Sequence, residues 1–135
     1  MANSTQRGRL LGLAHIGIMV KDAEVSMDFY MNKLGFELQA VQEMGPTKLV
    51  FLNAGTCQIE LVQKPDLEPR QPGPVDHIAI EVEDIEPLME RLKAQGVRFE
   101  TETFSFAKDL LGGVRNVFFR GPDDERIEFF DYMKK

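Results

Sequence analysis

Two short stretches of the chain carry the same alternation of apolar and polar positions. In Leu13–Val20 the isoleucines and the valine alternate with a histidine, a glycine and a methionine, and Val75–Val82 repeats this pattern. Aligning His15 with His77 gives an offset of 62 residues (77 − 15 = 62). Alternation with a period of two predicts a half-buried strand in each stretch, and the matching histidines indicate an internal repeat.

The elements predicted around these two strands follow one order in both halves. In the first half we predict a strand ending at residue 20, a helix over 23–33 and strands over 36–44, 48–53 and 57–63. In the second half we predict a strand over 75–82, a helix over 85–95, strands over 97–103, 114–120 and 125–132, and a longer loop over 104–113. Asp22 and Asp84 are predicted helix caps. Val25, Phe29 and Leu34 are predicted to form an apolar stripe on the first helix, which should face the core. Each half therefore reads βαβββ, and the predicted fold class is α+β.

The polar and proline-rich segments set the predicted domain organisation. Residues 1–9 are polar and without periodicity, which predicts a flexible tail. Residues 10–135 are short enough for one domain, with a first module over about 10–64 and a second over 75–135. Four prolines fall within 65–74, so this segment is predicted to link the modules rather than to continue a sheet.

Charge and cysteine usage exclude several classes of function. Twenty-two acidic against sixteen basic side chains give a net charge of −6, and no basic run is present. This balance argues against nucleic acid and anionic membrane surfaces as partners. No apolar run is long enough to cross a membrane, and the N-terminus lacks the apolar core of a signal peptide. With Cys57 as the single cysteine, we expect a cytoplasmic protein without an internal disulfide.

Four side chains capable of binding a metal occupy equivalent places in the two halves. His15 and His77 lie on the strand face opposite the aliphatic side chains that should face the helices. The segments around Glu60 and Glu128 also correspond, with an offset of 68 (128 − 60 = 68), and alternation puts both carboxylates on that same face. One such histidine or glutamate alone is more often a structural or solvent-facing residue. Two imidazoles and two carboxylates at repeated positions predict one divalent ion: Zn²⁺, Ni²⁺, Co²⁺, Mn²⁺ or Fe²⁺.

An ordered set of short motifs relates the chain to a known family. The set comprises His15-Ile16-Gly17-Ile18, Phe29-Tyr30 before Leu34-Gly35-Phe36, Ile59-Glu60-Leu61, Asp76-His77-Ile78-Ala79, and Val117 to Asp123 leading to Ile127-Glu128. With these motifs the chain resembles the vicinal oxygen chelate superfamily, which includes glyoxalase I, methylmalonyl-CoA epimerase, extradiol dioxygenases, fosfomycin-resistance enzymes and bleomycin-binding proteins. The resemblance implies two βαβββ modules whose mixed sheets curl into an open U, with the helices on the convex side and the metal inside.

The resemblance also implies roles for the four polar residues. All four family ligand positions are filled here, by His15, Glu60, His77 and Glu128. Methylmalonyl-CoA epimerases typically carry Gln at the Glu60 position, so Glu60 favours a glyoxalase I-like lyase or isomerase. Such an enzyme would act on a small hydroxycarbonyl or thiol adduct through an enediolate-like intermediate, with Glu60 and Glu128 as the candidate proton carriers. We expect a small-molecule substrate and a homodimer.

Other positions limit the choice of substrate. Glutathione-dependent glyoxalase I commonly has an Arg four residues after the first His and an Asn four residues after the first Glu, where this chain has Met19 and Lys64. Glutathione is therefore not the expected thiol. Met19, Glu81 and Lys108 are candidate substrate-binding residues. Alternative functions are an extradiol-type dioxygenase, a methylmalonyl-CoA epimerase-like enzyme and a non-catalytic small-molecule binding or resistance protein.

Overall fold

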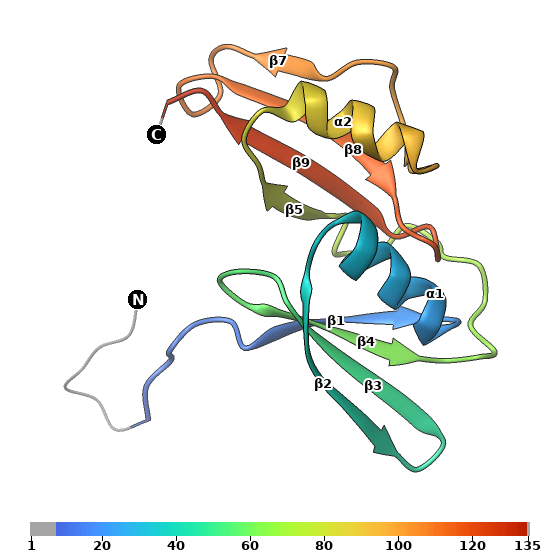
Figure 1. The fold of residues 1–135 in the computed structure, drawn as a ribbon. Coiled ribbons are helices and arrows are strands. Elements are labelled where there is room, and N and C mark those ends of the chain that lie inside the picture. Colours follow the sequence, from blue (N-terminus) through green and yellow to red (C-terminus); the bar gives the residue numbers. More distant parts are fainter. Residues whose placement is uncertain (1–7, 135) are drawn as a thin grey trace. The chain divides into compact units, whose positions relative to one another are not determined.

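The structure, a computed structural model, describes residues 8–134 and divides into two compact units (Figure 1). The first unit runs to Leu67 and the second begins at Glu68. Most of the predicted flexible tail, residues 1–7, lies outside the described residues. No helix in the described part of the chain is both long enough and apolar enough to cross a membrane.

The first unit is a four-stranded sheet with one helical segment. Its elements are β1 (His15–Val20), α1 (Ala23–Met27), the π-helical η1 (Asp28–Lys33), β2 (Glu37–Met44), β3 (Thr47–Asn53) and β4 (Gln58–Gln63). The strand order is β1-β4-β3-β2. The first and last strands of the unit pair in parallel, and the other neighbours are antiparallel.

The second unit repeats this topology with one additional short strand. Its elements are β5 (Ile78–Glu81), α2 (Ile85–Ala94), β6 (Arg98–Phe99), β7 (Ser105–Ala107), β8 (Val114–Arg120) and β9 (Arg126–Tyr132). The order is β5-β9-β8-β6, and β7 also pairs with β8. The predicted strand over 97–103 is thus much shorter, and the predicted loop over 104–113 contains β7. The reason is that one edge of the seven-residue β8 is shared by two short strands.

The two units share the register of their parallel strand pair. Ile16 lies opposite Ile59 in the first unit, and Ile78 lies opposite Ile127 in the second. These are the residues that the offsets of 62 and 68 match in the sequence (78 − 16 = 62; 127 − 59 = 68). The predicted α+β class with two related modules is confirmed.

In each unit the apolar face of the sheet is covered by the helix that follows its first strand. Helix α1 lies against β3 and β4, and α2 lies against β9 (Figure 1). The buried side chains include Val20, Leu52 and Leu61 in the first unit and Leu92 and Phe119 in the second. Burial of these side chains is the main source of stability for each unit. The opposite face of each sheet remains available for polar side chains.

The first helix departs from the predicted buried stripe. Val25 is 52% exposed, whereas Ser26, Phe29 and Tyr30 are buried. The buried residues Ser26, Phe29 and Tyr30 are spaced three and four positions apart, as on one face of a helix, and Val25 lies beside that face. The prediction was therefore right for Phe29 and wrong for Val25.

An aspartate was predicted to cap each helix, and the structure bears this out for one helix only. The Asp22 side chain accepts a hydrogen bond from the Glu24 amide at 3.0 Å, so this cap is confirmed. Asp84 is in the left-handed region, with φ 55°, and its side chain makes no capping bond, so that prediction was wrong.

Side chains from the last strand of each unit reach the first residue of the helix. Gln63 accepts a hydrogen bond from the Ala23 amide at 2.8 Å, and Asp131 accepts one from the Ile85 amide at 3.4 Å. Gln63 and Asp131 are equivalent in the repeat (131 − 63 = 68). A backbone donor at each helix start is therefore satisfied from the sheet, which ties helix and sheet together.

Candidate metal-binding residues

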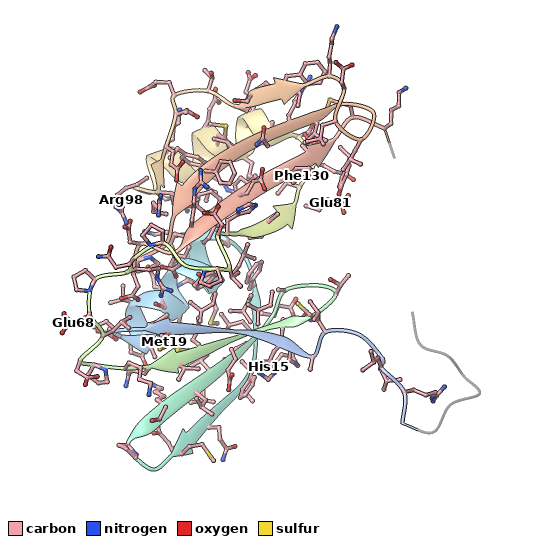
Figure 2. The ribbon with its side chains drawn as sticks, turned by 180° about the vertical axis from the view of Figure 1, so that it is seen from behind. His15, Met19, Glu68, Glu81, Arg98 and Phe130 are labelled. Atoms are coloured by element: carbon pink, nitrogen blue, oxygen red, sulfur yellow. The ribbon has the colours of Figure 1, made fainter. Side chains whose placement is uncertain are left out.

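In the first unit, β1 and β4 bring His15 and Glu60 together. Gly17 lies opposite Glu60 in the parallel pair, so the glutamate side chain rises beside the strand that carries the histidine. His15 Nε2 and Glu60 Oε1 are 3.2 Å apart. Side-chain exposure is 43% for His15 and 16% for Glu60, so both groups can be reached from solvent. Figure 2 labels His15 and, farther along the same strand, Met19.

In the second unit, His77 and Glu128 form the same pair. Ala79 of β5 lies opposite Glu128 of β9, and His77 immediately precedes β5. His77 Nε2 and Glu128 Oε1 are again 3.2 Å apart, with side-chain exposures of 35% and 7%. The sequence prediction that each unit presents one imidazole and one carboxylate on its polar face therefore agrees with the geometry.

The spacing in each pair suits two ligands of one metal ion. Nitrogen and oxygen ligands lie about 2.0–2.2 Å from a bound Zn²⁺, so neighbouring ligands are separated by roughly 3 Å. The measured 3.2 Å between Nε2 and Oε1 meets this requirement in both units. Within each unit, however, the described residues contain no group of three or more His, Cys, Asp or Glu side chains that could hold an ion. The metal-ligand roles of the four residues therefore remain predictions.

A phenylalanine accompanies each histidine, which the sequence reasoning missed. The Phe51 ring lies edge-on to His15, with centroids 5.9 Å apart, and the Phe118 ring lies edge-on to His77 at 5.2 Å. Phe51 and Phe118 also lie opposite Glu60 and Glu128, respectively, in the antiparallel registers. The two phenylalanines could have been found in the sequence by also aligning the strands that precede the last strand of each half, β3 and β8.

His77 has a carboxylate partner on its second ring nitrogen. Nδ1 of His77 lies 2.8 Å from Asp76 Oδ2. The same carboxylate oxygen accepts a hydrogen bond from Arg126 at 2.8 Å, and Arg126 also donates from Nε and Nη2 to the two oxygens of Glu100, at 2.9 Å and 3.1 Å. The Arg126 guanidinium lies over the Phe118 ring, 3.8 Å from its centroid. An ion-pair network thus surrounds this histidine.

These contacts shift the pKa values of the charged groups in the directions that keep them charged. Hydrogen bonds from His77 first, and then from Arg126, hold the pKa of Asp76 below its ordinary value. The hydrogen bond from Arg126 likewise lowers the pKa of Glu100, and its contact with Glu100 raises the pKa of Arg126. Asp76 and Glu100 are therefore ionised at neutral pH.

Glu128 is also held by an amide. Asn116 Nδ2 donates to Glu128 Oε2 at 2.9 Å, and this leaves Oε1 as the oxygen nearest His77. Because the bond fixes one carboxylate oxygen, the orientation of the other is fixed as well.

Among its described residues, the first unit has no counterpart of these supporting polar groups. By the offsets of the repeat and the strand registers, Ala14 stands in the place of Asp76, Leu49 in the place of Asn116, and Gln58 in the place of Arg126. Among the described residues, no hydrogen-bond partner is found for Nδ1 of His15. The two pairs therefore have the same geometry and different surroundings.

The predicted substrate-binding residues lie at three different places. Met19 is 47% exposed on the face of β1 that carries His15. Glu81 is exposed at the end of β5, opposite Phe130 of β9 (Figure 2). Lys108 is exposed in the turn after β7. The proposed roles of these three residues in substrate binding remain predictions.

Comparison with known proteins places this geometry in a family. The model of the glyoxalase/bleomycin resistance protein/dioxygenase superfamily matches residues 12–129. An uncharacterized protein of Bacillus subtilis, YwbC, is 34% identical over 121 residues, which cover 86% of this chain and 94% of that protein.

Two further similar proteins carry the names of enzymes. A lactoylglutathione lyase of Neisseria meningitidis is 33% identical over 125 residues, covering 87% of this chain and 88% of that protein. The structure of a trypanothione-dependent glyoxalase I of Leishmania major superposes with a TM-score of 0.69 at 27% identity, covering 87% of this chain and 84% of that one. With a family model that spans both units and both His–Glu pairs, the chain belongs to the glyoxalase/bleomycin resistance protein/dioxygenase superfamily.

Proposed function

We propose that the chain is a metal-dependent lyase or isomerase of the glyoxalase I-like type. The observation that carries this proposal is the His–Glu pair that occurs twice, with Nε2 and Oε1 3.2 Å apart in both units. One pair alone is a common hydrogen-bonded arrangement. Two pairs at equivalent registers supply the two imidazoles and two carboxylates that a divalent ion accepts.

In this proposal His15, Glu60, His77 and Glu128 hold one divalent ion. Such an ion would polarise a substrate carbonyl and stabilise negative charge on its oxygen. The histidines would hold the ion through Nε2. Glu60 and Glu128 are the groups that can accept a proton from the carbon beside the carbonyl and return it to the neighbouring carbon. The expected substrate is a small hydroxycarbonyl or thiol adduct that passes through an enediolate-like intermediate.

Similarity to the lactoylglutathione lyase of Neisseria meningitidis supports the reaction class. This similarity does not indicate that the thiol is glutathione. Met19 and Lys64 occupy the two positions at which a basic and an amide side chain would be expected to bind glutathione. We therefore propose a thiol other than glutathione, or a substrate without a thiol. The cytoplasmic location and the homodimer expected from the sequence remain predictions.

A substrate screen of the metal-loaded protein tests the reaction class. Hydroxycarbonyl compounds, thioesters and catechols are incubated with the Ni²⁺, Zn²⁺, Co²⁺, Mn²⁺ and Fe²⁺ forms, under air and under nitrogen. We expect an isomerisation or adduct-forming reaction that proceeds equally well under nitrogen. A reaction that requires oxygen together with Fe²⁺ or Mn²⁺ would instead identify an extradiol-type dioxygenase. Tight binding of a small molecule without turnover or metal would identify a binding or resistance protein.

A further inference from the structure

We propose that Asp76, held by Arg126, is a positioning residue that fixes the His77 ring with Nε2 directed to the metal. This inference rests on the proposed function, because it assumes that His77 is a ligand. It goes further in assigning a role to three residues outside the predicted ligand set: Asp76, Arg126 and Glu100. Their contacts also make the two His–Glu pairs inequivalent.

The first step is the orientation of the ring. His77 Nδ1 lies 2.8 Å from Asp76 Oδ2, and an ionised carboxylate can only accept a hydrogen bond. The proton of a neutral imidazole held in this contact therefore sits on Nδ1, which leaves the lone pair on Nε2. A metal-binding imidazole needs this form, and a carboxylate on its other nitrogen also raises its basicity as a ligand.

The second step is the support of Asp76 itself. Its side chain is 58% exposed, and a lone exposed carboxylate would hold the ring only weakly. Arg126 donates to the same oxygen at 2.8 Å and is itself fixed by two bonds to Glu100. A forked guanidinium–carboxylate contact of this kind restrains the arginine more than a single bond does.

The third step is the aromatic contact that links this network to the ring. The Arg126 guanidinium lies 3.8 Å from the centroid of Phe118, and the Phe118 ring meets His77 edge-on at 88°. The imidazole is therefore restrained by Asp76 at Nδ1 and by Phe118 at its side. At the equivalent positions of the first unit, His15 has a phenylalanine neighbour but follows an alanine, Ala14.

The test is a metal titration of the stripped full-length protein with Zn²⁺ in competition with a chelator. The variants are D76A, which removes the acceptor, and D76N, which keeps an oxygen acceptor without the charge. D124A is the matched control, because Asp124 is a similarly exposed aspartate (54%) in an ion pair with Arg98 of the same unit. We expect a loss of Zn²⁺ affinity of about 10–100-fold for D76A, an intermediate loss for D76N and no change for D124A.

A second readout separates positioning from general stability. In the ¹⁵N-labelled, Zn²⁺-loaded protein we expect a His77 Nδ1–H resonance that exchanges slowly with water and is lost in D76A. The thermal unfolding midpoint of the stripped protein should fall only slightly, as expected for the loss of an exposed ion pair. An affinity of D76A within about twofold of wild type, or an equal loss in D124A, would overturn the inference and leave the proposed function intact. Failure of the wild-type chain to bind Zn²⁺ would overturn both.

Discussion

The two His–Glu pairs are alike in the atoms they present and unlike in what holds those atoms. In both units the Nε2–Oε1 separation is 3.2 Å and a phenylalanine lies edge-on to the histidine. In the second unit Asp76 contacts the histidine and Asn116 contacts the glutamate, whereas Ala14 and Leu49 stand at those places in the first. Among the described residues, the pair in the second unit is thus held by polar contacts that have no counterpart around the pair in the first.

This difference shows which features the repeat preserves. Strand register and alternation suffice to bring each histidine to its glutamate, because both pairs form from the same parallel strand pairing. The polar support depends on individual side chains and differs between the halves. A ligand that must stay on the metal benefits from support, whereas a carboxylate that carries a proton benefits from freedom to move.

The largest expected effect comes from changing the less supported carboxylate, Glu60, to Gln. The amide keeps the size and one oxygen but removes the base, so the rate should fall by roughly 10²–10⁴-fold. Metal should be retained, because three ligands, His15, His77 and Glu128, remain. In a dioxygenase, two histidines and one carboxylate already complete the iron site, so E60Q would keep most of its activity. Steady-state rates and metal content of the same preparation distinguish these outcomes.

The same change at Glu128 should affect metal binding more than it does at Glu60. In E128Q the Asn116 amide keeps its acceptor only if the new amide oxygen takes the place of Oε2, which turns the NH₂ group toward His77 Nε2. An NH₂ group does not bind a metal, so we expect E128Q to have a Zn²⁺ affinity about 10–100-fold below that of E60Q. Calorimetric titration of both variants measures the difference. Adding N116L, which copies Leu49 of the first unit, should restore part of the affinity; equal affinities of E60Q and E128Q would contradict the comparison.

The two units also differ four residues after the histidine, where Met19 corresponds to Glu81 (81 − 19 = 62). Neither residue can pair with the carboxylates of glutathione, so turnover of the methylglyoxal–glutathione adduct should be poor. M19R should improve kcat/KM for this adduct by about tenfold, since a hydrogen bond between charged groups contributes about 1.5–3 kcal/mol. M19K is the control, because lysine supplies the positive charge without the two parallel donors of a guanidinium group. Robust turnover by the wild-type chain in a thioester-formation assay would show that Met19 does not exclude glutathione.

The smallest expected effect concerns the ion pairs found only in the second unit. The hydrogen bond from Arg126 lowers the pKa of Glu100 in the folded protein. The contact therefore stabilises the folded protein above pH 4.5, the ordinary pKa of Glu100 that applies to the unfolded state. This stabilisation is lost as the pH falls through the lower pKa of Glu100 in the folded state. Near pH 7, E100Q should lower the free energy of unfolding by about 1 kcal/mol or less, and the difference from wild type should be smaller near pH 3.

Chemical denaturation at the two pH values measures this difference. E102Q is the control, since it neutralises a neighbouring exposed glutamate whose carboxylate makes no ion pair in the described structure. A destabilisation by E100Q that is equally large near pH 3 would mean that packing, and not the ion pair, is responsible.

Much of the strand structure could be predicted because alternation is a local signal. The predicted strand over 114–120 coincides with β8, and the histidine and glutamate pairs follow from the repeat together with the faces of the strands. What could not be predicted depends on contacts between distant residues. Asp84 looks like a cap in the sequence, but the donor at the start of α2 is satisfied by Asp131 of β9.

The same reason explains why the support of His77 was missed. Asp76 is adjacent to His77 in the sequence, but its partner Arg126 is 50 residues away and Glu100 is 26 residues from Arg126. Nothing in the local pattern distinguishes Arg126 from an ordinary charge on a strand. The π-helical segment that follows Met27 was missed as well, because the apolar spacing gave no signal for it.

Metal stoichiometry tests the central claim most directly. The stripped full-length chain is titrated with Ni²⁺, Co²⁺ and Zn²⁺, and bound metal is counted by elemental analysis for wild type, H15A and H77A. We predict one ion per chain for wild type and a large loss of metal affinity in both variants. The loss should be greater in H77A, because this variant removes the histidine that Asp76 holds in position. Stoichiometry near zero for the wild-type chain with all three metals, or full binding by both histidine variants, would contradict the account.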